Sequence, residues 1–322
     1  FINSFWSLIT IYLTILALGS IMMGNLAVAK LISNWFDKNA GRALGIAAVG
    51  ISFSGVVLPL IVDPLLDIVG WRNVYVIFAS VVLFIILPLI FFVVIDDPYT
   101  VNQVKDGMKR DLEEESLPKV MTSKNLLSKK VFWIISLAFA FQFLSMMGVI
   151  AFLPIHASKM GLDQTWNLIG FPVKQYVFAY ALAAFGGVLG KLIFGYLIDI
   201  MKAAYPSMLA MSLQATGIFG FTYFSEPSIF LLSALIFGLG YGAATPLMTA
   251  CYLRAFGSNN LGKARGISSP IVAPLQPIGI LITSIFIGFQ DTYFVAFNIM
   301  GCFALVAVFV ASQISEPEKI KT

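Results

Sequence analysis

Long apolar runs separated by short charged connections dominate this chain. A membrane-spanning helix needs about 20 apolar residues to cross a hydrocarbon core about 30 Å thick. Nine segments reach this length, and the only charged side chain inside any of them is Lys191. These segments are residues 1–29, 43–62, 73–95, 131–155, 175–198, 203–225, 227–253, 266–290 and 292–315. Their length favours helices over the alternating segments of about ten residues that build an outer-membrane barrel. The pattern therefore predicts an all-α polytopic membrane protein.

Composition supports the same class. The chain is 59% hydrophobic and 11% charged, with a mean hydropathy of +0.91, whereas soluble domains are about 45–50% apolar and about 25% charged. This composition excludes a soluble enzyme and a soluble nucleic-acid binder. The net charge of +4 is no argument for nucleic-acid binding, because 20 basic residues are offset by 16 acidic ones. Cys251 and Cys302 lie in apolar runs and are expected to be core residues, not a disulfide or metal site. Segment 1–29 is too long for a cleaved signal peptide.

Basic residues fall mainly in alternate connections between the spans. Sixteen Lys and Arg lie on one side, including seven in the 96–130 loop, against Arg72, Lys159 and Lys174 on the other. Because positive residues concentrate in cytoplasmic loops, the 96–130 loop and the C-terminus are expected in the cytoplasm. The expected location is a bacterial cytoplasmic (inner) membrane.

Two short sequences indicate an internal repeat. Residues 41–46 read GRALGI and residues 262–267 read GKARGI, an offset of 221. At that offset, a unit opening at Val131 has a counterpart opening about 90 residues before Phe1, which is the length of three spans. We therefore expect residues 1–95 to be the last three spans of one six-helix unit and 131–322 a complete second unit. The 96–130 segment, with seven charges of each sign, is expected to be a solvated cytoplasmic loop, or alternatively a small amphipathic domain.

Three motifs resemble those of the major facilitator superfamily. The first, Gly190-Lys191-Leu192-Ile193-Phe194-Gly195-Tyr196-Leu197-Ile198-Asp199, resembles its GRxxxGxLxD signature at the cytoplasmic end of helix 8. Residues 34–38 with 41–46 are similar to its helix 4–5 junction, and residues 70–75 to the start of its helix 6. Within the superfamily, the chain is most similar to the bacterial monocarboxylate-transporter-like branch. The similarity lies in the helix 4–5 junction and in residues 255–257 with 262–263. Two departures are Asn39-Ala40, where the family usually has Arg-Gly or Arg-Arg, and Lys191, where arginine is usual.

The resemblance implies nine of twelve helices, arranged as two six-helix bundles related by a pseudo-two-fold axis and lacking helices 1–3. Lys191 is then the main candidate for substrate binding. An ionisable residue within a span costs roughly 2.5–3.5 kcal/mol, and eight residues before Asp199 place Lys191 about 12 Å deep. Gly187 and Gly195, one turn away on either side, put it on a face where another helix packs closely. The alternative is a lysine that snorkels to the interface. In the resembled transporters this cation meets a substrate carboxylate or a coupling acid.

Other candidates are weaker. Asn25 is a buried amide suited to substrate or to helix contact, while Gln142, Tyr241 and Thr245 lie on helices that line the cavity in the resembled family. Residues expected at the cytoplasmic mouth are Gly190, Gly195, Asp199, Arg42 and Arg265, where charge contacts hold one conformation closed. Topology determination alone would also explain the two arginines. Pro270, Pro274 and Pro277 are expected to break or kink the 266–290 span.

The sequence thus predicts a secondary transporter with alternating access. We expect proton-coupled uptake or exchange of a small, monocarboxylate-like organic anion by a monomer in the lipid bilayer, without cofactor, metal, catalytic residues or nucleic acid. Alternatives are efflux of another solute class, a non-transporting membrane sensor, and a membrane enzyme such as an acyltransferase. The enzyme would need clustered polar groups, and the sequence has a single histidine, His156.

Overall fold

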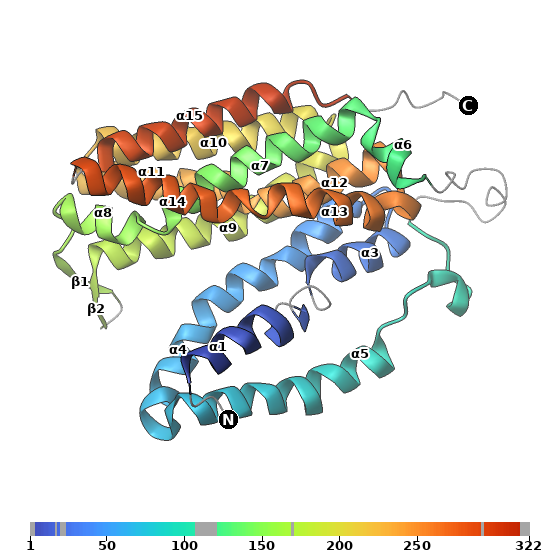
Figure 1. Ribbon diagram of the computed structural model, residues 1–322, viewed down its shortest axis with the longest axis horizontal. Helices are drawn as coiled ribbons and strands as arrows, with labels where there is room; N and C mark the ends of the chain where they lie inside the picture. The colour runs from blue at the N-terminus through green and yellow to red at the C-terminus, as the bar shows by residue number, and fades with distance from the viewer. Residues whose placement is uncertain are drawn as a thin grey trace.

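Helices account for nearly all of the structure, a computed structural model that describes residues 4–16, 18–19, 24–106, 121–168, 171–290 and 293–315. The first part of the chain, residues 5–93, comprises α1 (Phe5–Ile11), α3 (Asn25–Trp35), α4 (Ala40–Val81) and α5 (Leu87–Val93), with π-helical turns at Tyr12–Leu16 and Val82–Ile86. In Figure 1, α4 starts beside α9 and α12 and then diverges from the other helices, and α5 runs back along the lower edge.

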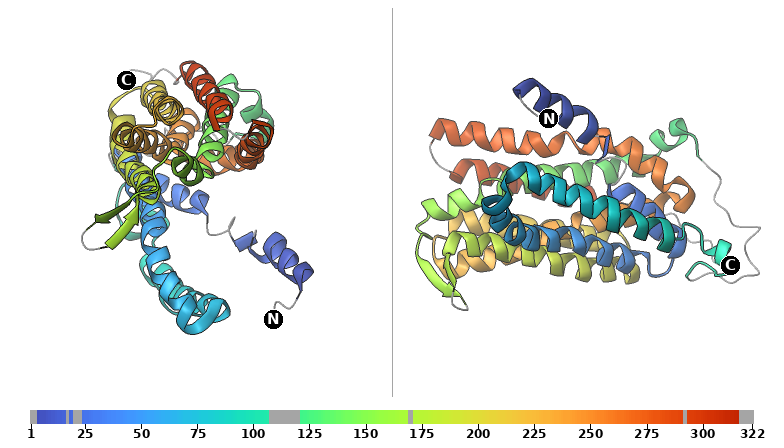
Figure 2. Two further views of the ribbon diagram at one scale, coloured as in Figure 1. Left: turned by 90° about the vertical axis from the view of Figure 1, so that its left-hand side faces the viewer. Right: turned by 90° about the horizontal axis from the view of Figure 1, so that it is seen from below.

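Residues 130–311 form the second part, a bundle of nine helical segments. In order they are α7 (Lys130–Ile150), α8 (Leu153–Lys159), α9 (Gln175–Ile200), α10 (Ala204–Tyr223), α11 (Pro227–Gly242), α12 (Ala244–Phe256), α13 (Ser258–Val272), α14 (Leu275–Gln290) and α15 (Tyr293–Ala311). Seen end-on in Figure 2, these helices gather in one bundle from which α4 projects. Between the two parts lie a 3-10 turn (Pro98–Val101) and α6 (Ser123–Leu127).

The predicted all-α polytopic class is confirmed. Six helical segments in the described part of the chain are long and apolar enough to cross a membrane. They are Ile68–Val93, Lys130–Ile150, Gln175–Ile200, Pro227–Phe256, Ser258–Gly288 and Tyr293–Ala311. The predicted spans 43–62 and 203–225 fall on α4 and α10, whereas the predicted span 1–29 includes residues outside the described ones.

Glycine and proline interrupt the long helices. Gly70 breaks α4 with φ 72° and ψ 160°, a conformation that residues with a Cβ rarely adopt, so the chain turns there from one span into the next. Pro274 lies between α13 and α14, which confirms that the 266–290 span is broken. An antiparallel hairpin was not expected from the sequence. Its strands are β1 (Thr165–Leu168) and β2 (Phe171–Lys174), with Thr165 opposite Lys174, in the connection before α9.

Helix ends follow the offset of the repeat. Helix α3 ends at Trp35 and α12 at Phe256, 221 residues apart. Asn39 and Asn260 are separated by the same number, and each binds one end of the connection between the two parts. The Asn39 backbone N–H and Nδ2 donate to Asp106 Oδ2 at 3.0 and 2.9 Å, and Asn260 Oδ1 accepts from the Met121 N–H at 2.7 Å. The described ends of the connection are therefore fixed at equivalent positions of the two repeats.

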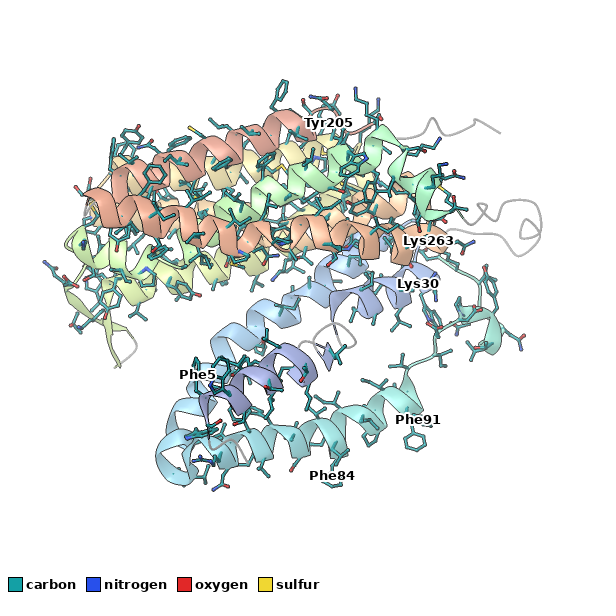
Figure 3. The ribbon with its side chains drawn as sticks, in the orientation of Figure 1. Phe5, Lys30, Phe84, Phe91, Tyr205 and Lys263 are labelled. Atoms are coloured by element: carbon teal, nitrogen blue, oxygen red, sulfur yellow. The ribbon has the colours of Figure 1, made fainter. Side chains whose placement is uncertain are left out.

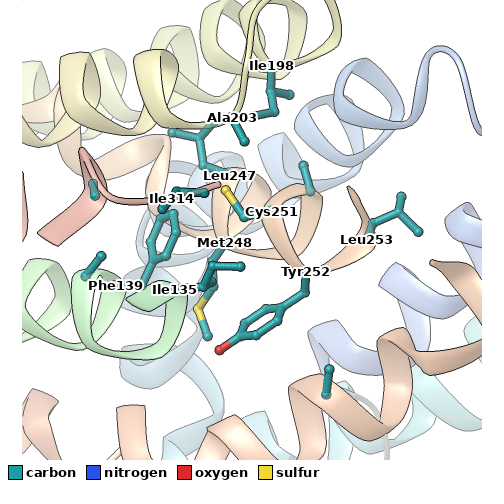
Figure 4. Packing of buried hydrophobic residues seen from close by; sticks show 14 of the residues in the cluster. Ile135, Phe139, Ile198, Ala203, Leu247, Met248, Cys251, Tyr252, Leu253 and Ile314 are labelled. Carbon is teal, nitrogen blue, oxygen red and sulfur yellow. The ribbon is translucent and has the colours of Figure 1, made fainter. Parts of the chain in front are cut away.

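The hydrophobic core lies mainly within the second part. Ile135 and Phe139 of α7 pack beside Leu247, Met248 and Tyr252 of α12 (Figure 4). In the first part, by contrast, Phe84 and Phe91 point outward (Figure 3) and are 73% and 80% exposed. Outward-facing apolar side chains on a membrane-spanning segment suit contact with lipid.

Glycines allow α4 and α9 to touch backbone to backbone, and this contact joins the two parts. A Cβ on Gly41 would meet Ile198 and Asp199, and one on Gly45 would meet the Lys191 carbonyl oxygen. From the α9 side, a Cβ on Gly195 would lie 2.7 Å from the Gly41 carbonyl oxygen. Small residues four apart on a helix are the usual means of such close packing in membranes.

Replacing Gly45 with alanine should therefore force α4 away from α9. We expect Gly45→Ala to lower the melting temperature of the purified protein in detergent, since overpacking of this kind costs about 1–3 kcal/mol. Gly50, on the same helix, has nothing within 4 Å of its Cβ position, so Gly50→Ala is the matched control and should leave the melting temperature unchanged or slightly raised. Equal melting temperatures for the two variants would contradict the contact.

Candidate functional site

A cavity of about 780 Å³ lies between the two parts of the chain. Gly24, just before α3, and Leu26 of α3 line it from the first part. From the second part come Phe143, Met146 and Met147 of α7, Thr245 and Met248 of α12, and a row of residues from Arg265 to Gln276. This volume is in the usual range for small-molecule sites. The lining is mostly apolar, with Arg265, Thr245, Ser269 and Gln276 among its polar members.

A smaller cavity of about 220 Å³ lies next to it. Its walls are α3, the start of α4 and α12, and most of the lining side chains, such as Leu44, Ala47 and Ala48, are apolar. Thr245, a candidate from the sequence, lines both cavities.

The two parts meet at the end of the helices where Lys30, Arg42, Arg254 and Lys263 lie, which we call the basic end. Figure 3 shows Lys30 and Lys263 there, and Lys30 Nζ donates to the Ser258 carbonyl at 3.0 Å. Asp199 closes the contact. Its carboxylate accepts hydrogen bonds from the backbone N–H groups of Gly41 and Arg42 at 2.7 and 2.9 Å, amides that the start of α4 leaves without a helical partner.

Arg42 adds to this contact in two ways. Its Nε lies 3.8 Å from Asp199 Oδ2, and its guanidinium group lies over the Tyr196 ring at 4.4 Å from the centroid. The structure therefore brings together Arg42, Asp199 and Gly195 from the set expected at the mouth. Gly190 instead faces the Leu239 backbone, where α9 packs against α11.

Arg265, the remaining residue of that set, lies on α13. It lines the larger cavity and is partly buried, and it contributes no ion pair to the contact around Asp199. The Tyr252 hydroxyl donates to Ser136 Oγ at 2.7 Å, since Ser136 itself donates to the Phe132 carbonyl. Its oxygen then lies close to Ser268, and the charge of Arg265 is near enough to act on it electrostatically.

Lys191 is buried, with 6% of its surface exposed. Its backbone faces Gly45 of α4, and one turn earlier on α9 the Tyr241 hydroxyl lies over Gly187. Lys191 of α9 and the Tyr241 hydroxyl of α11 thus lie one turn apart along α9. Neither residue lines the larger cavity.

Gln142 also lies away from the cavity lining. Its Nε2 donates to the Gly240 carbonyl at 3.3 Å, inside the second part. Gln214, which the sequence analysis did not single out, donates from Nε2 to the Gln142 carbonyl at 3.0 Å and to Ser145 Oγ at 2.8 Å. Gln214 could have been found from the sequence, because a glutamine inside an apolar span must have hydrogen-bond partners. The side chain of Asn25 lies outside the described residues.

His156 occupies an aromatic enclosure and is not among the residues that line the two cavities. Its Nε2 lies 2.9 Å from the Phe221 carbonyl oxygen, and the rings of Tyr293 and Phe297 flank it. Burial lowers the pKa of His156, so the neutral ring donates to that carbonyl. Among the described residues no group of three or more His, Cys, Asp or Glu could hold a metal ion.

Comparison with known proteins agrees with this architecture. The sequence profile of the Major Facilitator Superfamily matches residues 1–279. The fold is similar to the crystal structure of a variant of the Escherichia coli fucose:proton symporter, with a TM-score of 0.57, 12% identity and coverage of 91% of this chain and 73% of that chain. A search of curated proteins gives no significant match. The chain is an integral multi-pass membrane protein of the major facilitator superfamily, a family of secondary transporters.

Proposed function

We propose that this protein carries a small organic anion across the bacterial cytoplasmic membrane together with protons, by alternating access. The observation that supports this most is the cavity of about 780 Å³ between two parts that touch at the basic end and diverge toward the other (Figure 1). A site between two bundles that rock against each other is the general plan of such transporters. The similar fold of a fucose:proton symporter supports coupling to protons.

The orientation follows from charge. Sixteen Lys and Arg on the side of the basic end, against three on the other, favour a cytoplasmic basic end and C-terminus. In this orientation the contact around Asp199 closes the cytoplasmic side. The proposal includes the division of the chain into residues 1–95, a cytoplasmic loop 96–130 and residues 131–322. It also includes a monocarboxylate-like substrate and action as a monomer.

Lys191 supports an anionic substrate. It is a buried lysine on a membrane-spanning helix, beside the helix contact that must change when the two parts rock. A cation at this depth is costly and is expected to be used. We propose that Lys191 of α9 and Tyr241 of α11, whose hydroxyl lies against the same stretch of α9, couple substrate and proton binding to the α4–α9 contact.

Uptake of labelled carboxylates tests the function directly. The full chain in proteoliposomes should take up at least one member of a panel of acetate, pyruvate, lactate and benzoate. A protonophore should reduce that uptake, because the proton gradient drives it. Failure to transport any member would refute the substrate class, and uptake that a protonophore leaves unchanged would refute proton coupling.

Neutralising Lys191 should impair transport. Lys191→Gln is expected to reduce carboxylate uptake at least about tenfold, which corresponds to about 1.4 kcal/mol, while Lys191→Arg keeps the charge and should retain much of the activity. Lys174→Gln, which neutralises an exposed lysine just before the same helix, is the control and should behave as the unaltered protein. Normal uptake by well-expressed Lys191→Gln protein would show that the charge has no role in transport.

Weakening the contact at Asp199 should open the basic end. Asp199→Asn loses the ion pair and one of two acceptors for the start of α4. A cysteine at Ala40, which is 4% exposed, should then react with a maleimide several-fold faster in a background carrying Cys251→Ser and Cys302→Ser. Asp163→Asn, at the opposite end where Ser158 donates to that carboxylate, should leave the rate unchanged. Unaltered labelling in Asp199→Asn would mean that the carboxylate does not hold this end closed.

A further inference from the structure

The two cavities are lined by equivalent faces of the two repeats. Leu44, Ala47, Ala48 and Ile51 of α4 line the smaller cavity. The residues 221 positions later, Arg265, Ser268, Ser269 and Val272 of α13, line the larger one. The repeat thus uses one helical face in the same way twice, but with different chemistry. Where α4 presents only apolar side chains, α13 presents a guanidinium group and two hydroxyls.

The charge on this face lacks a carboxylate partner in the described part of the chain. The ion pairs found there are Arg42 with Asp199 and Lys105 with Asp37, and neither involves Arg265. A partly buried cation in a mostly apolar cavity is costly unless an anion neutralises it. Nearby groups fix the segment: Ser268 Oγ donates to the Arg265 carbonyl at 2.9 Å, and the Tyr252 hydroxyl lies close to Ser268.

Polar side chains continue along the same wall. Ser269, four residues after Arg265 and therefore on the same helical face, is exposed, and Gln276 lies further along. The opposite wall contains Phe143, Met146 and Met147. An arginine fork matches the two oxygens of a carboxylate, and a serine hydroxyl can donate to one of them.

We propose that Arg265 and Ser269 form an anion-binding subsite on α13, which receives the carboxylate of a substrate whose apolar remainder lies against Phe143, Met146 and Met147. This inference rests on the proposed transport function and deepens it. Arg265 is then a substrate-binding residue in the cavity and not a gating residue at the cytoplasmic mouth. The subsite is separate from Lys191, which does not line this cavity.

Charge-selective labelling tests the subsite without knowledge of the substrate. Ser269→Cys is introduced into a background carrying Cys251→Ser and Cys302→Ser, and the purified full chain in detergent reacts with two methanethiosulfonate reagents of similar size. One carries a sulfonate and the other a trimethylammonium group. We expect the sulfonate reagent to react faster relative to a free thiol in solution, and Arg265→Gln to reduce this preference about tenfold. Pyruvate, but not its neutral amide, should slow the reaction when Arg265 is present.

An exposed position in the apolar cavity supplies the control. Ala47 is exposed and lines the apolar cavity on α4, so Ala47→Cys should show no preference for the sulfonate and no response to Arg265→Gln. An unchanged preference at Ser269→Cys in Arg265→Gln protein would overturn the subsite. Failure of both reagents to react would also overturn it, because an anion could not reach the arginine. A protein that transports no carboxylate yet shows the charge preference would refute the proposed substrate and leave the subsite standing.

Discussion

The close approach of α4 to α9, with the first amides of α4 bound by Asp199, is the contact on which the arrangement of the two parts depends. Gly41, Gly45 and Gly195 remove the side chains that would separate the helices, and the carboxylate satisfies N–H groups that a helix start leaves unpaired. Because this contact lies at one end, the helices of the two parts can diverge toward the other (Figure 1). The larger cavity lies between the start of α3 and helices of the second part, which this contact holds together.

An internal repeat supplies the scaffold, and the departures from the repeat supply the chemistry. Trp35 and Phe256 end equivalent helices, and Asn39 and Asn260 bind the connection at equivalent places. At the next turn the equivalence of side chains fails, since Leu44 corresponds to Arg265 and Ala48 to Ser269. Residues at the same offset of 221 thus line an apolar space on α4 and a cationic one on α13. Asymmetry of this kind lets a symmetric scaffold bind an asymmetric solute.

Sequence patterns predicted what depends on local length and chemistry. The apolar runs predicted the helices, and Pro274 predicted the break between α13 and α14. The signature that ends at Asp199 identified the carboxylate that pairs with Arg42. The place of Arg265 in the lining of the larger cavity could not be predicted, because its distance along the chain from a basic connection does not reveal which way its side chain faces. Gln214 was missed for a related reason: its partners Gln142 and Ser145 come from another helix. The β1–β2 hairpin lies in a connection that no apolar periodicity marks.

The contact at the basic end is strong enough to define a state and weak enough to be released. The ion pair contributes little, because Arg42 is 44% exposed and its Nε is 3.8 Å from the carboxylate; such pairs are worth about 0–1 kcal/mol. Two charge-assisted hydrogen bonds to the α4 amides add about 1.5–3 kcal/mol each when water is excluded, and less at this end. The sum is a few kcal/mol, comparable to the roughly 5.5 kcal/mol of differential binding that reverses a two-state population from 1:99 to 99:1. A ligand that binds the cavity more tightly in one state can therefore break this contact, whereas a larger buried polar interface would hold the two parts in a single conformation.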